Sequence, residues 1–575
     1  MQKKQTILVV ASLLVVVLSV TLAYFAAQII GKGKDVLVTS ADLKIVFTDT
    51  DGNIEGTGIT PGWSSSKTFT VKNESNGTYK DDIIIKDLIN TFKTYKYLQY
   101  KITSTDGGYN MTEYSYLPKA STKEDVALAY EISIDKGKTH TYTVEIKYVN
   151  DEYVDQSIDM GQSLNGTIYI REFTKPIMKL TDKLMADNPT IGTRTTFTAF
   201  TETNTGTLYK ATEQIGTNPV KDVYYFAGDA KNNWVKFGKT TESSCTYKGK
   251  EVVYVNMTDR IRRNPETETE CTSTNICDAI YIGYVVGLTE NECSGMDVTN
   301  WITEKATWNG TSTKDIYWRI IRTNADGSIK LLYAGTSPDT TSGYIGTGTF
   351  NATYNDPMYV GYKYGTTGSL ENNRLNTNDS TIKTYIDNWY KNNLTAYTKY
   401  LSNNAVYCND RNLASGSTYS PSDYFEYASY DRIDTNKQPT YNCTNMSDAF
   451  SVNNTSAKLD YPIGLMTIDE LSYAGGESNT DLTAPYAWYY TNANGESITN
   501  FAESWSLSPF NWDGSYSLVW YWGDSSHPGY LDFDGVDSLN AVRPSVSLSS
   551  CNLISRGNGS PEKPYEVYTG SGVCE

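Results

Sequence analysis

The chain has 575 residues, of which only 20% are charged, and its formal net charge is −17. This acidic balance argues against a nucleic-acid partner, because phosphate binding requires a basic surface. With only two histidines, the chain has almost no material for histidine catalysis or multi-histidine metal sites. Its 47 tyrosines and many small polar residues are typical of β-rich extracellular proteins.

Residues 5–31 carry no charge and are rich in Leu, Val and Ile, directly after Lys3 and Lys4. A secretory signal has a shorter apolar region of about 7–15 residues, whereas a membrane-spanning helix needs about 20. We therefore expect a single-pass transmembrane anchor over residues 5–31, with the bulk of the chain extracellular. The alternative is a cleaved signal, in which case the protein is secreted.

Residues 36–173 show strand periodicity, with apolar residues at every second position in segments such as Leu43-x-Ile45-x-Phe47. Short strands separated by turn clusters predict a β-sandwich stalk. The stretch from Pro61-Gly62-Trp63 to the F-T-V-K-N of residues 69–73 resembles that of camelysin/TasA-like bacterial surface and biofilm-fibre proteins. That resemblance implies a β-sandwich.

Residues 174–207 are expected to link the stalk to a head, as a short helix followed by a Thr-rich segment. The head spans residues 208–575, with a Cys-rich insertion at residues 239–314. A helix with an apolar stripe is expected to begin after Asp379 or Ser380 and to end at Asn392-Asn393. Residues 324–327 (N-A-D-G) predict the turn of a hairpin.

The cysteines are even in number, which downstream of an export signal indicates disulfides. Cys551 and Cys574 bracket the turn-rich end of the chain and are expected to pair. The other sequential pair is Cys408–Cys443. The remaining four are expected to pair among themselves in one of three ways, which the sequence does not choose: Cys245, Cys271, Cys277 and Cys293.

The stretch over residues 461–548 is the most informative part of the head. Thr467 and Glu470 form a T-x-x-E capping box at the start of a short apolar helix, which two glycines end. A run rich in tryptophan follows, and then Ala541-Val542-Arg543. This order resembles the C-type-lectin-like fold in its formylglycine-generating-enzyme branch. Together with the motifs over residues 207–567, it also resembles an uncharacterised domain of bacterial surface proteins.

The expected fold class is therefore mainly β with an α+β head: an N-terminal transmembrane helix, a β-sandwich and a C-type-lectin-like C-terminal module. We expect no enzyme activity and no cofactor. The formylglycine-generating branch requires a reactive cysteine pair inside the module, and no cysteine lies between Cys443 and Cys551. Common catalytic motifs do not occur in a matching context either.

Aromatic residues supply the candidate ligand-binding site. Trp520 and Trp522 share one face of a predicted strand, since side chains alternate along a strand. We expect Trp505 and Trp520 to lie in the core. Rings that are exposed on loops can stack on sugars or contact a peptide. The ligand-binding candidates in the loops over residues 491–535 are Trp512, Trp522, His527 and Tyr530.

Three carboxylates in the same region, Asp532, Asp534 and Asp537, offer the oxygen ligands that Ca²⁺ prefers. The alternative, which we favour, is an ordinary hairpin with Asp-Gly at its turn.

These observations predict a bacterial cell-surface adhesion or ligand-binding protein. Its partner would be a glycan or a protein on another surface, and the N-terminal helix would hold it at the membrane. The alternative is a structural subunit of a surface or biofilm fibre, in which the β-sandwich self-associates by strand exchange.

Overall fold

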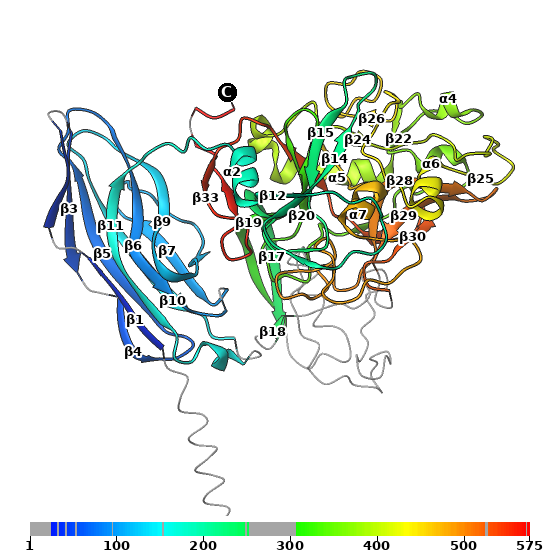
Figure 1. The fold of residues 1–575 in the computed structure, drawn as a ribbon. Coiled ribbons are helices and arrows are strands. Elements are labelled where there is room, and N and C mark those ends of the chain that lie inside the picture. The colour runs from blue at the N-terminus through cyan, green and yellow to red at the C-terminus, as the bar shows by residue number, and fades with distance from the viewer. Residues whose placement is uncertain are drawn as a thin grey trace, which may run out of the picture. The chain divides into compact units, whose positions relative to one another are not determined.

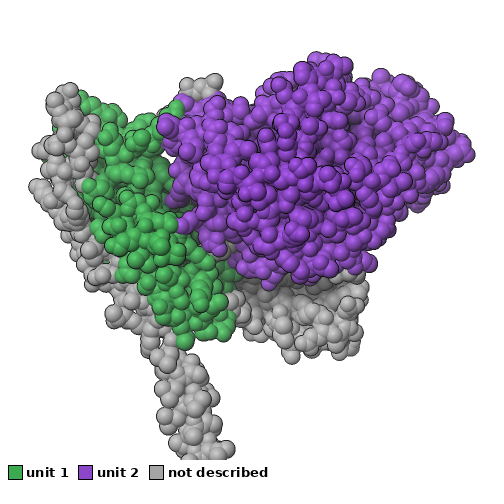
Figure 2. Space-filling view, viewed as in Figure 1, with its two compact units in different colours: residues 1–175 green, residues 176–575 purple. Residues whose placement is uncertain are grey.

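The computed structural model describes residues 25–31, 34–40, 43–51, 54–94, 96–151, 155–247, 250–251, 306–523, 527–570 and 572–574. The chain divides into two compact units, which we call unit 1 (Met1–Lys175) and unit 2 (Pro176–Glu575) and which Figure 2 colours separately. In both units strands are the main regular secondary structure (Figure 1), so the prediction of a mainly β protein is confirmed.

Unit 1 is built from two sheets. The first has the strand order β4 (Ile54–Ile59), β1 (Phe25–Gly31), β11 (Ser163–Glu172), β6 (Tyr79–Asn90) and β9 (Ala120–Ile134). The second has the order β2 (Lys34–Ser40), β3 (Leu43–Asp51), β5 (Ser64–Asn73), β10 (Thr139–Tyr148), β7 (Leu98–Ser104) and β8 (Ser115–Tyr116). One 3₁₀ turn, η1 (Gln156–Asp159), precedes β11.

Side-chain alternation places the core of unit 1 between these sheets. Along β10 every second residue is buried, and Tyr142, Val144 and Ile146 belong to the same apolar cluster as Ile83 and Ile85 of β6. One face of each sheet therefore supplies the core, as expected for a β-sandwich.

The last part of the N-terminal apolar segment is a strand, although we expected a helix over residues 5–31. Its last residues form strand β1, which pairs parallel to β11 and antiparallel to β4. A β-strand can be as rich in apolar residues as a membrane span, so hydropathy did not mark this boundary. Residues 5–24 lie outside the described part of the chain. Among the described residues no helix is long and apolar enough to cross a membrane.

Unit 1 also buries a carboxyl group that has no hydrogen-bond partner. Asp81 of β6 is fully buried, and among the described residues neither of its side-chain oxygens has a partner. Burial, with a further contribution from Asp82, raises the pKa of Asp81 to about 8. Asp82 itself contacts Arg171, 3.1 Å away. The folded state of unit 1 therefore favours a protonated Asp81.

This predicts an unusual pH dependence. The native state binds a proton that the unfolded chain releases near pH 4, so unit 1 loses stability as the pH rises from about 4 to about 8. Asp81→Asn should abolish this loss, which amounts to at most about 5 kcal/mol. Hydrogen exchange of the β6 amides across this pH range measures the effect. Asp135→Asn, at an exposed position, serves as the control; a flat profile in the wild type would contradict the prediction.

Unit 2 contains a large sheet of eleven strands. Its main path runs through β12 (Thr190–Gly192), β14 (Thr207–Glu213), β15 (Lys221–Tyr225), β19 (Ala306–Thr323), β17 (Trp234–Tyr247), β34 (Tyr565–Val567) and β33 (Ile554–Arg556). Four further strands attach to it: β18 (Lys250–Glu251), β20 (Ile329–Tyr333), β32 (Ser545–Leu548) and β27 (Ile463–Gly464). The predicted hairpin turn lies between β19 and β20, where the Gly327 amide donates to the Asn324 carbonyl at 2.9 Å.

A second, six-stranded sheet carries the tryptophan-rich stretch. Its path is β21 (Thr347–Gly348), β31 (Asn540–Ala541), β28 (Ser504–Trp512), β29 (Ser517–Trp522) and β30 (Leu531–Gly535), and β25 (Phe425–Glu426) pairs with β28. Three two-stranded ladders complete the sheets of the described residues: β13 (Thr203–Asn204) with β16 (Asp229–Ala230), β22 (Lys363–Tyr364) with β23 (Asn378–Asp379), and β24 (Tyr407–Cys408) with β26 (Ala449–Phe450).

The described helices of unit 2 are short. They are α2 (Leu180–Asp187), η4 (Pro357–Val360), α4 (Leu370–Asn373), α5 (Thr381–Asn393), η5 (Thr395–Tyr400), α6 (Ala428–Tyr430), the π-helical turn η6 (Asp431–Thr435) and α7 (Ile468–Ala474). Ser380 caps α5, as predicted, by accepting a hydrogen bond from the Lys383 amide. Thr467 and Glu470 form the predicted capping box of α7. Gly475 ends that helix at φ 121°, a conformation that side chains other than glycine rarely adopt.

Residues 176–207 belong to unit 2, although we expected residues 174–207 to form a linker. Leu180 and Leu184 of α2 are buried, and the Leu180 amide donates to the Asn552 carbonyl at 3.0 Å. Helix α2 is therefore packed within unit 2, and its first residue is hydrogen-bonded to the segment at Asn552.

Two of the predicted disulfides are present. Cys408–Cys443 and Cys551–Cys574 are both formed, so these pairings are confirmed. The pairing of Cys245, Cys271, Cys277 and Cys293 lies outside the described residues, as does most of the predicted insertion at residues 239–314.

Candidate functional site

The capping box of α7 lies at the centre of a buried charge cluster. Glu470 is fully buried and accepts hydrogen bonds from the Lys330 ammonium (2.8 Å) and the Arg322 guanidinium (2.9 Å), in addition to the Thr467 amide (3.0 Å). Arg322 also contacts Glu213 at 2.9 Å. Burial alone would raise the pKa of Glu470, but Lys330 and Arg322 hold it below its ordinary value. The cluster therefore fixes α7 to strands β14, β19 and β20.

A cavity of about 20 Å³ adjoins this cluster and is lined by Arg322, Lys330 and Glu470, among others. That volume holds about one water molecule and no substrate. The charge cluster is consequently part of the scaffold.

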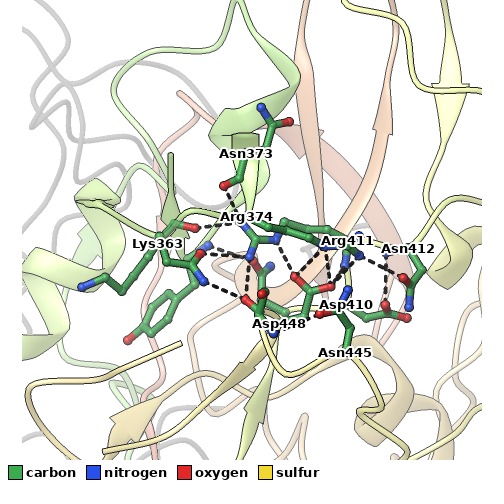
Figure 3. Close-up of polar contacts among 12 residues, drawn as sticks. Lys363, Asn373, Arg374, Asp410, Arg411, Asn412, Asn445 and Asp448 are labelled. Atoms are coloured by element: carbon green, nitrogen blue, oxygen red, sulfur yellow. Dashed lines mark hydrogen bonds and ion pairs between the residues drawn. The ribbon is translucent and has the colours of Figure 1, made fainter. Parts of the chain in front are cut away.

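A second buried network lies beside the Cys408–Cys443 disulfide. Figure 3 shows Arg374 and Arg411 converging on Asp448, with Nη2 of Arg374 at 2.7 Å and Nε of Arg411 at 2.8 Å from its oxygens. Arg411 also donates to the backbone carbonyls of Lys363 (3.0 Å) and Asn373 (3.1 Å). These bonds join β22, α4 and the loop after β24.

Arg432 connects the scaffold to the surface turn η6. Its Nε and Nη2 donate to the two oxygens of Asp469 in α7, at 2.8 and 2.9 Å, and its Nη1 donates to Asp410 at 2.8 Å. All three guanidinium nitrogens therefore donate to scaffold carboxylates, and these bonds fix the orientation of η6. π-Helical turns occur frequently at functional sites, so the residues that η6 presents are of interest.

Among the described residues, one group of carboxylates has the spacing of a metal site. It consists of Asp379, Asp387 and Asp460, whose oxygens lie within 4.8 Å of one another, at a cleft of about 320 Å³. The buried ammonium of Lys383 lies among them, at 3.1, 2.6 and 2.9 Å. Burial disfavours its charged form, yet Asp387, Asp460 and Asp379 together raise its pKa above the ordinary value. The lysine therefore supplies the cation that these carboxylates require.

The structure places Trp512 and Trp522 in the core, contrary to our expectation of exposed rings. Both have 2% of their surface exposed, and Trp505 and Trp520 are buried as predicted. Every residue of β28 is buried, because this strand lies inside the sheet and is covered on both faces. We expected irregular loops over residues 491–535, but the central and last parts of this run form β28, β29 and β30.

The other two candidates lie at the surface. His527 is exposed and Tyr530 is half-buried, and their rings are 5.2 Å apart. The Tyr530 hydroxyl donates to Asn479 Oδ1 at 2.9 Å, and Asn479 Nδ2 donates to Asp434 of η6 at 2.9 Å. These contacts place Tyr530 and His527 at the margin of the surface that η6 forms.

The calcium candidates Asp532, Asp534 and Asp537 do not form a three-carboxylate cluster. The Asp532 carboxylate accepts a hydrogen bond from the Phe533 amide, and the Asp534 carboxylate accepts one from the Gly535 amide. Each carboxylate is therefore bonded to the next residue of its own strand. Asp532 and Asp534 belong to strand β30, and Asp537 lies in the turn after it. Asp534-Gly535 is the end of β30, paired with β29, and is not the turn of a hairpin that the alternative expected.

Sequence reasoning missed the rings that do reach the surface. Phe533 of β30 is 41% exposed and Tyr424 is 56% exposed, while Tyr430 of α6 is half-buried. The Phe533 ring is stacked on the Phe510 ring, with centroids 3.8 Å apart and planes at 7°. The Tyr430 ring makes a T-shaped contact with the Phe510 ring, with centroids 5.6 Å apart. We call Tyr424, Tyr430, Phe510 and Phe533 the outer aromatic surface.

Buried side chains hold the outer aromatic surface in place. Phe510 packs against Trp520 with ring centroids 4.7 Å apart. The Trp520 indole donates to Ser429 of α6 at 3.1 Å, and the Ser429 hydroxyl donates to the Pro509 carbonyl. Figure 1 shows α6 and β25 beside β28, β29 and β30. One sheet and one short helix therefore present the rings, and the predicted core residue Trp520 aligns them.

Oxygen acceptors surround these rings. Glu426 accepts from the Tyr424 hydroxyl at 2.5 Å, and burial and this bond raise the pKa of Tyr424 to about 12. Burial, and next the neighbouring Asp434, raise the pKa of Tyr430. The third acceptor is Asn511, the cross-strand neighbour of Glu426. The arrangement can stack a flat apolar ligand face and accept hydrogen bonds around its rim.

No family model matches the chain, and no curated protein does. One solved structure that matches is entitled "AvmM Catalyzes Macrocyclization in Alchivemycin A Biosynthesis"; it has 8% sequence identity and a TM-score of 0.14, over 24% of this chain and 93% of that one. A likeness of this size carries no conclusion about fold or activity.

The Glu470 cluster predicts a specific pattern of stability. Glu470→Gln keeps a side chain that can cap α7 but leaves the Lys330 charge buried without its partner, so unit 2 should lose about 3–5 kcal/mol. Adding Lys330→Met should recover part of this loss, because the unpaired charge is removed. Urea unfolding measures both variants, with Glu371→Gln at an exposed site of α4 as the control. If Glu470→Gln were as stable as the wild type, Glu470 would not be the charge partner on which the buried Lys330 depends.

The Lys383 site predicts that calcium can replace the lysine ammonium in a variant that lacks it. Lys383→Met leaves three carboxylates facing one another, so unit 2 should be destabilised by about 3 kcal/mol or more. Burial raises the pKa of Asp387 and Lys383 opposes this, so the penalty should be larger at neutral than at acidic pH. Calcium should raise the Tm of this variant and not that of the wild type.

The matched control is Lys391→Met, which removes an exposed lysine from the same helix and should change little. Equal Tm values for Lys383→Met and Lys391→Met would contradict this interpretation.

Proposed function

We propose that the protein is an extracytoplasmic ligand-binding protein, used for adhesion, whose unit 2 binds a glycan on the outer aromatic surface. The observation that carries this proposal is the Phe533 ring. One face of it is stacked on Phe510, while the side chain remains 41% exposed. A fixed aromatic ring with a free face is a platform on which sugar rings stack, and the neighbouring oxygens can accept hydrogen bonds from hydroxyl groups.

The rigidity of the mounting supports a binding role. The rings stand on a sheet and on helix α6, which the Trp520–Ser429 hydrogen bond ties to it, and Arg432 ties the adjoining turn η6 to α7. Little side-chain entropy is therefore lost when a ligand binds. Tyr530 and His527, proposed from the sequence, extend the surface past Asn479. Trp512 and Trp522 are no longer part of the proposal, because they are buried.

Cellular location and fold complete the proposal. Two disulfides support an oxidising compartment, and the uncharged segment upstream of β1 is proposed to anchor the chain in a membrane. A C-type-lectin-like fold for unit 2 is proposed on the capped helix α7 and on the fully buried Arg543, which donates to the carbonyls of Tyr333 and Tyr489. No catalytic role is proposed.

A glycan array of neutral, amino and acidic oligosaccharides tests this function. Phe533→Ala should weaken binding of every glycan that the wild type retains, by roughly 1–2 kcal/mol, and should leave unit 2 folded. Trp522→Ala should instead destabilise unit 2 by about 3–5 kcal/mol, because the ring is in the core.

Leu375→Ala, which removes another exposed apolar side chain of unit 2, should leave binding unchanged. Absence of any bound glycan, or full binding by Phe533→Ala, would overturn the proposed function.

A further inference from the structure

Hydrogen-bond acceptors border the outer aromatic surface. Glu426 and Asp434 contribute carboxylates, and Asp434 already accepts from Ser478 and Asn479 at 2.8 and 2.9 Å. Both carboxylates are only half-buried, so their remaining lone pairs face the surroundings. A ligand that fits such a rim must supply hydrogen-bond donors.

The negative charge of this rim is not neutralised by the protein. In the described parts of the chain, neither Glu426 nor Asp434 takes part in an ion pair. The nearby Arg432 is directed inward to Asp410 and Asp469, and Lys437 contacts Glu477 at 3.6 Å. The rim can therefore pair with a cationic ligand, in a chain whose net charge is already −17.

A buried acceptor at the same place points independently to a ligand. Asn511 is 6% exposed, and its Oδ1 has no hydrogen-bond partner among the described residues. The same side chain interacts with the Tyr424 hydroxyl, which places it under the outer aromatic surface. Because an unsatisfied buried acceptor costs free energy, a donor is expected to reach it in the bound state.

Aromatic faces and carboxylates together favour a cation. The rings of Tyr424, Tyr430 and Phe533 can contact an ammonium group through their π faces, and Glu426 and Asp434 supply the opposite charge. Anionic sugars such as sialylated or sulfated glycans would be repelled by the same carboxylates.

We propose that the outer aromatic surface selects oligosaccharides of hexosamines with free amino groups. This inference rests on the proposed glycan-binding function and adds the class of ligand. The sugar rings stack on Phe533, and the amines and hydroxyl groups donate to Glu426, Asp434 and Asn511.

Two oligosaccharides with the same backbone test the inference: a glucosamine hexasaccharide and its fully N-acetylated equivalent, compared by calorimetry with the full-length protein in a buffer acidic enough to protonate the amines. The free amine form should bind roughly five-fold tighter, and the advantage should shrink as salt is added. Glu426→Gln with Asp434→Asn should reduce the advantage to about one-fold and preserve weak binding of both sugars. Glu371→Gln, at an exposed carboxylate outside the rim, should keep it.

Each outcome separates the two claims. Equal affinity for both sugars in the wild type would overturn the amine selectivity and leave glycan binding standing. Binding of neither sugar, together with an empty glycan array, would overturn both. If the Glu426→Gln, Asp434→Asn double variant still binds the free amine form more tightly, the amines contact other residues. That result would overturn the assignment of the amines to Glu426 and Asp434.

Discussion

The structure of unit 2 depends on one buried carboxylate, that of Glu470. The same side chain closes the capping box of α7 and accepts from the ammonium of Lys330 and the guanidinium of Arg322, two cations that would be costly to bury alone. Because β14, β19 and β20 supply the other charges, the helix start and the large sheet are fixed together. The next residue toward the N-terminus, Asp469, then holds Arg432 and through it the turn η6. A single helix end therefore links the interior to the surface.

The proposed site follows from this division between scaffold and surface. Buried aromatic rings fill the six-stranded sheet, and the Phe533 ring, stacked on buried Phe510, reaches solvent. The acceptors beside it come from β25 and η6, which are close together in the chain, and from β28, which is distant from both in sequence. The surface combines several acceptors with no paired cation among the described residues. We infer from this combination that it favours ligands that carry hydrogen-bond donors. Rigid mounting reduces the entropy lost on binding, and uncompensated charge determines the type of ligand.

Local signals in the sequence predicted local structure well. The capping box at Thr467, the Ser380 cap and the turn at Gly327 are each determined by residues within a few positions, and all three are found. Strand alternation also predicted a mainly β chain. It did not predict that β28 is covered on both faces, since coverage depends on segments such as β25 and α6 that are distant in sequence. Exposure of Trp512 and Trp522 was therefore expected wrongly, and Tyr424 and Tyr430 had no local pattern that could identify them.

The central claim is that ligand contact occurs at the outer aromatic surface and not at the buried tryptophans. ¹⁹F NMR of the full-length protein labelled with fluorotyrosine and fluorophenylalanine, with resonances assigned by single substitutions, tests it most directly. On addition of the glucosamine hexasaccharide, the Tyr430 and Phe533 resonances should shift with ligand concentration, while that of the buried Tyr362 should stay in place. Shifts confined to other residues, with Tyr430 and Phe533 unchanged at saturation, would contradict the account.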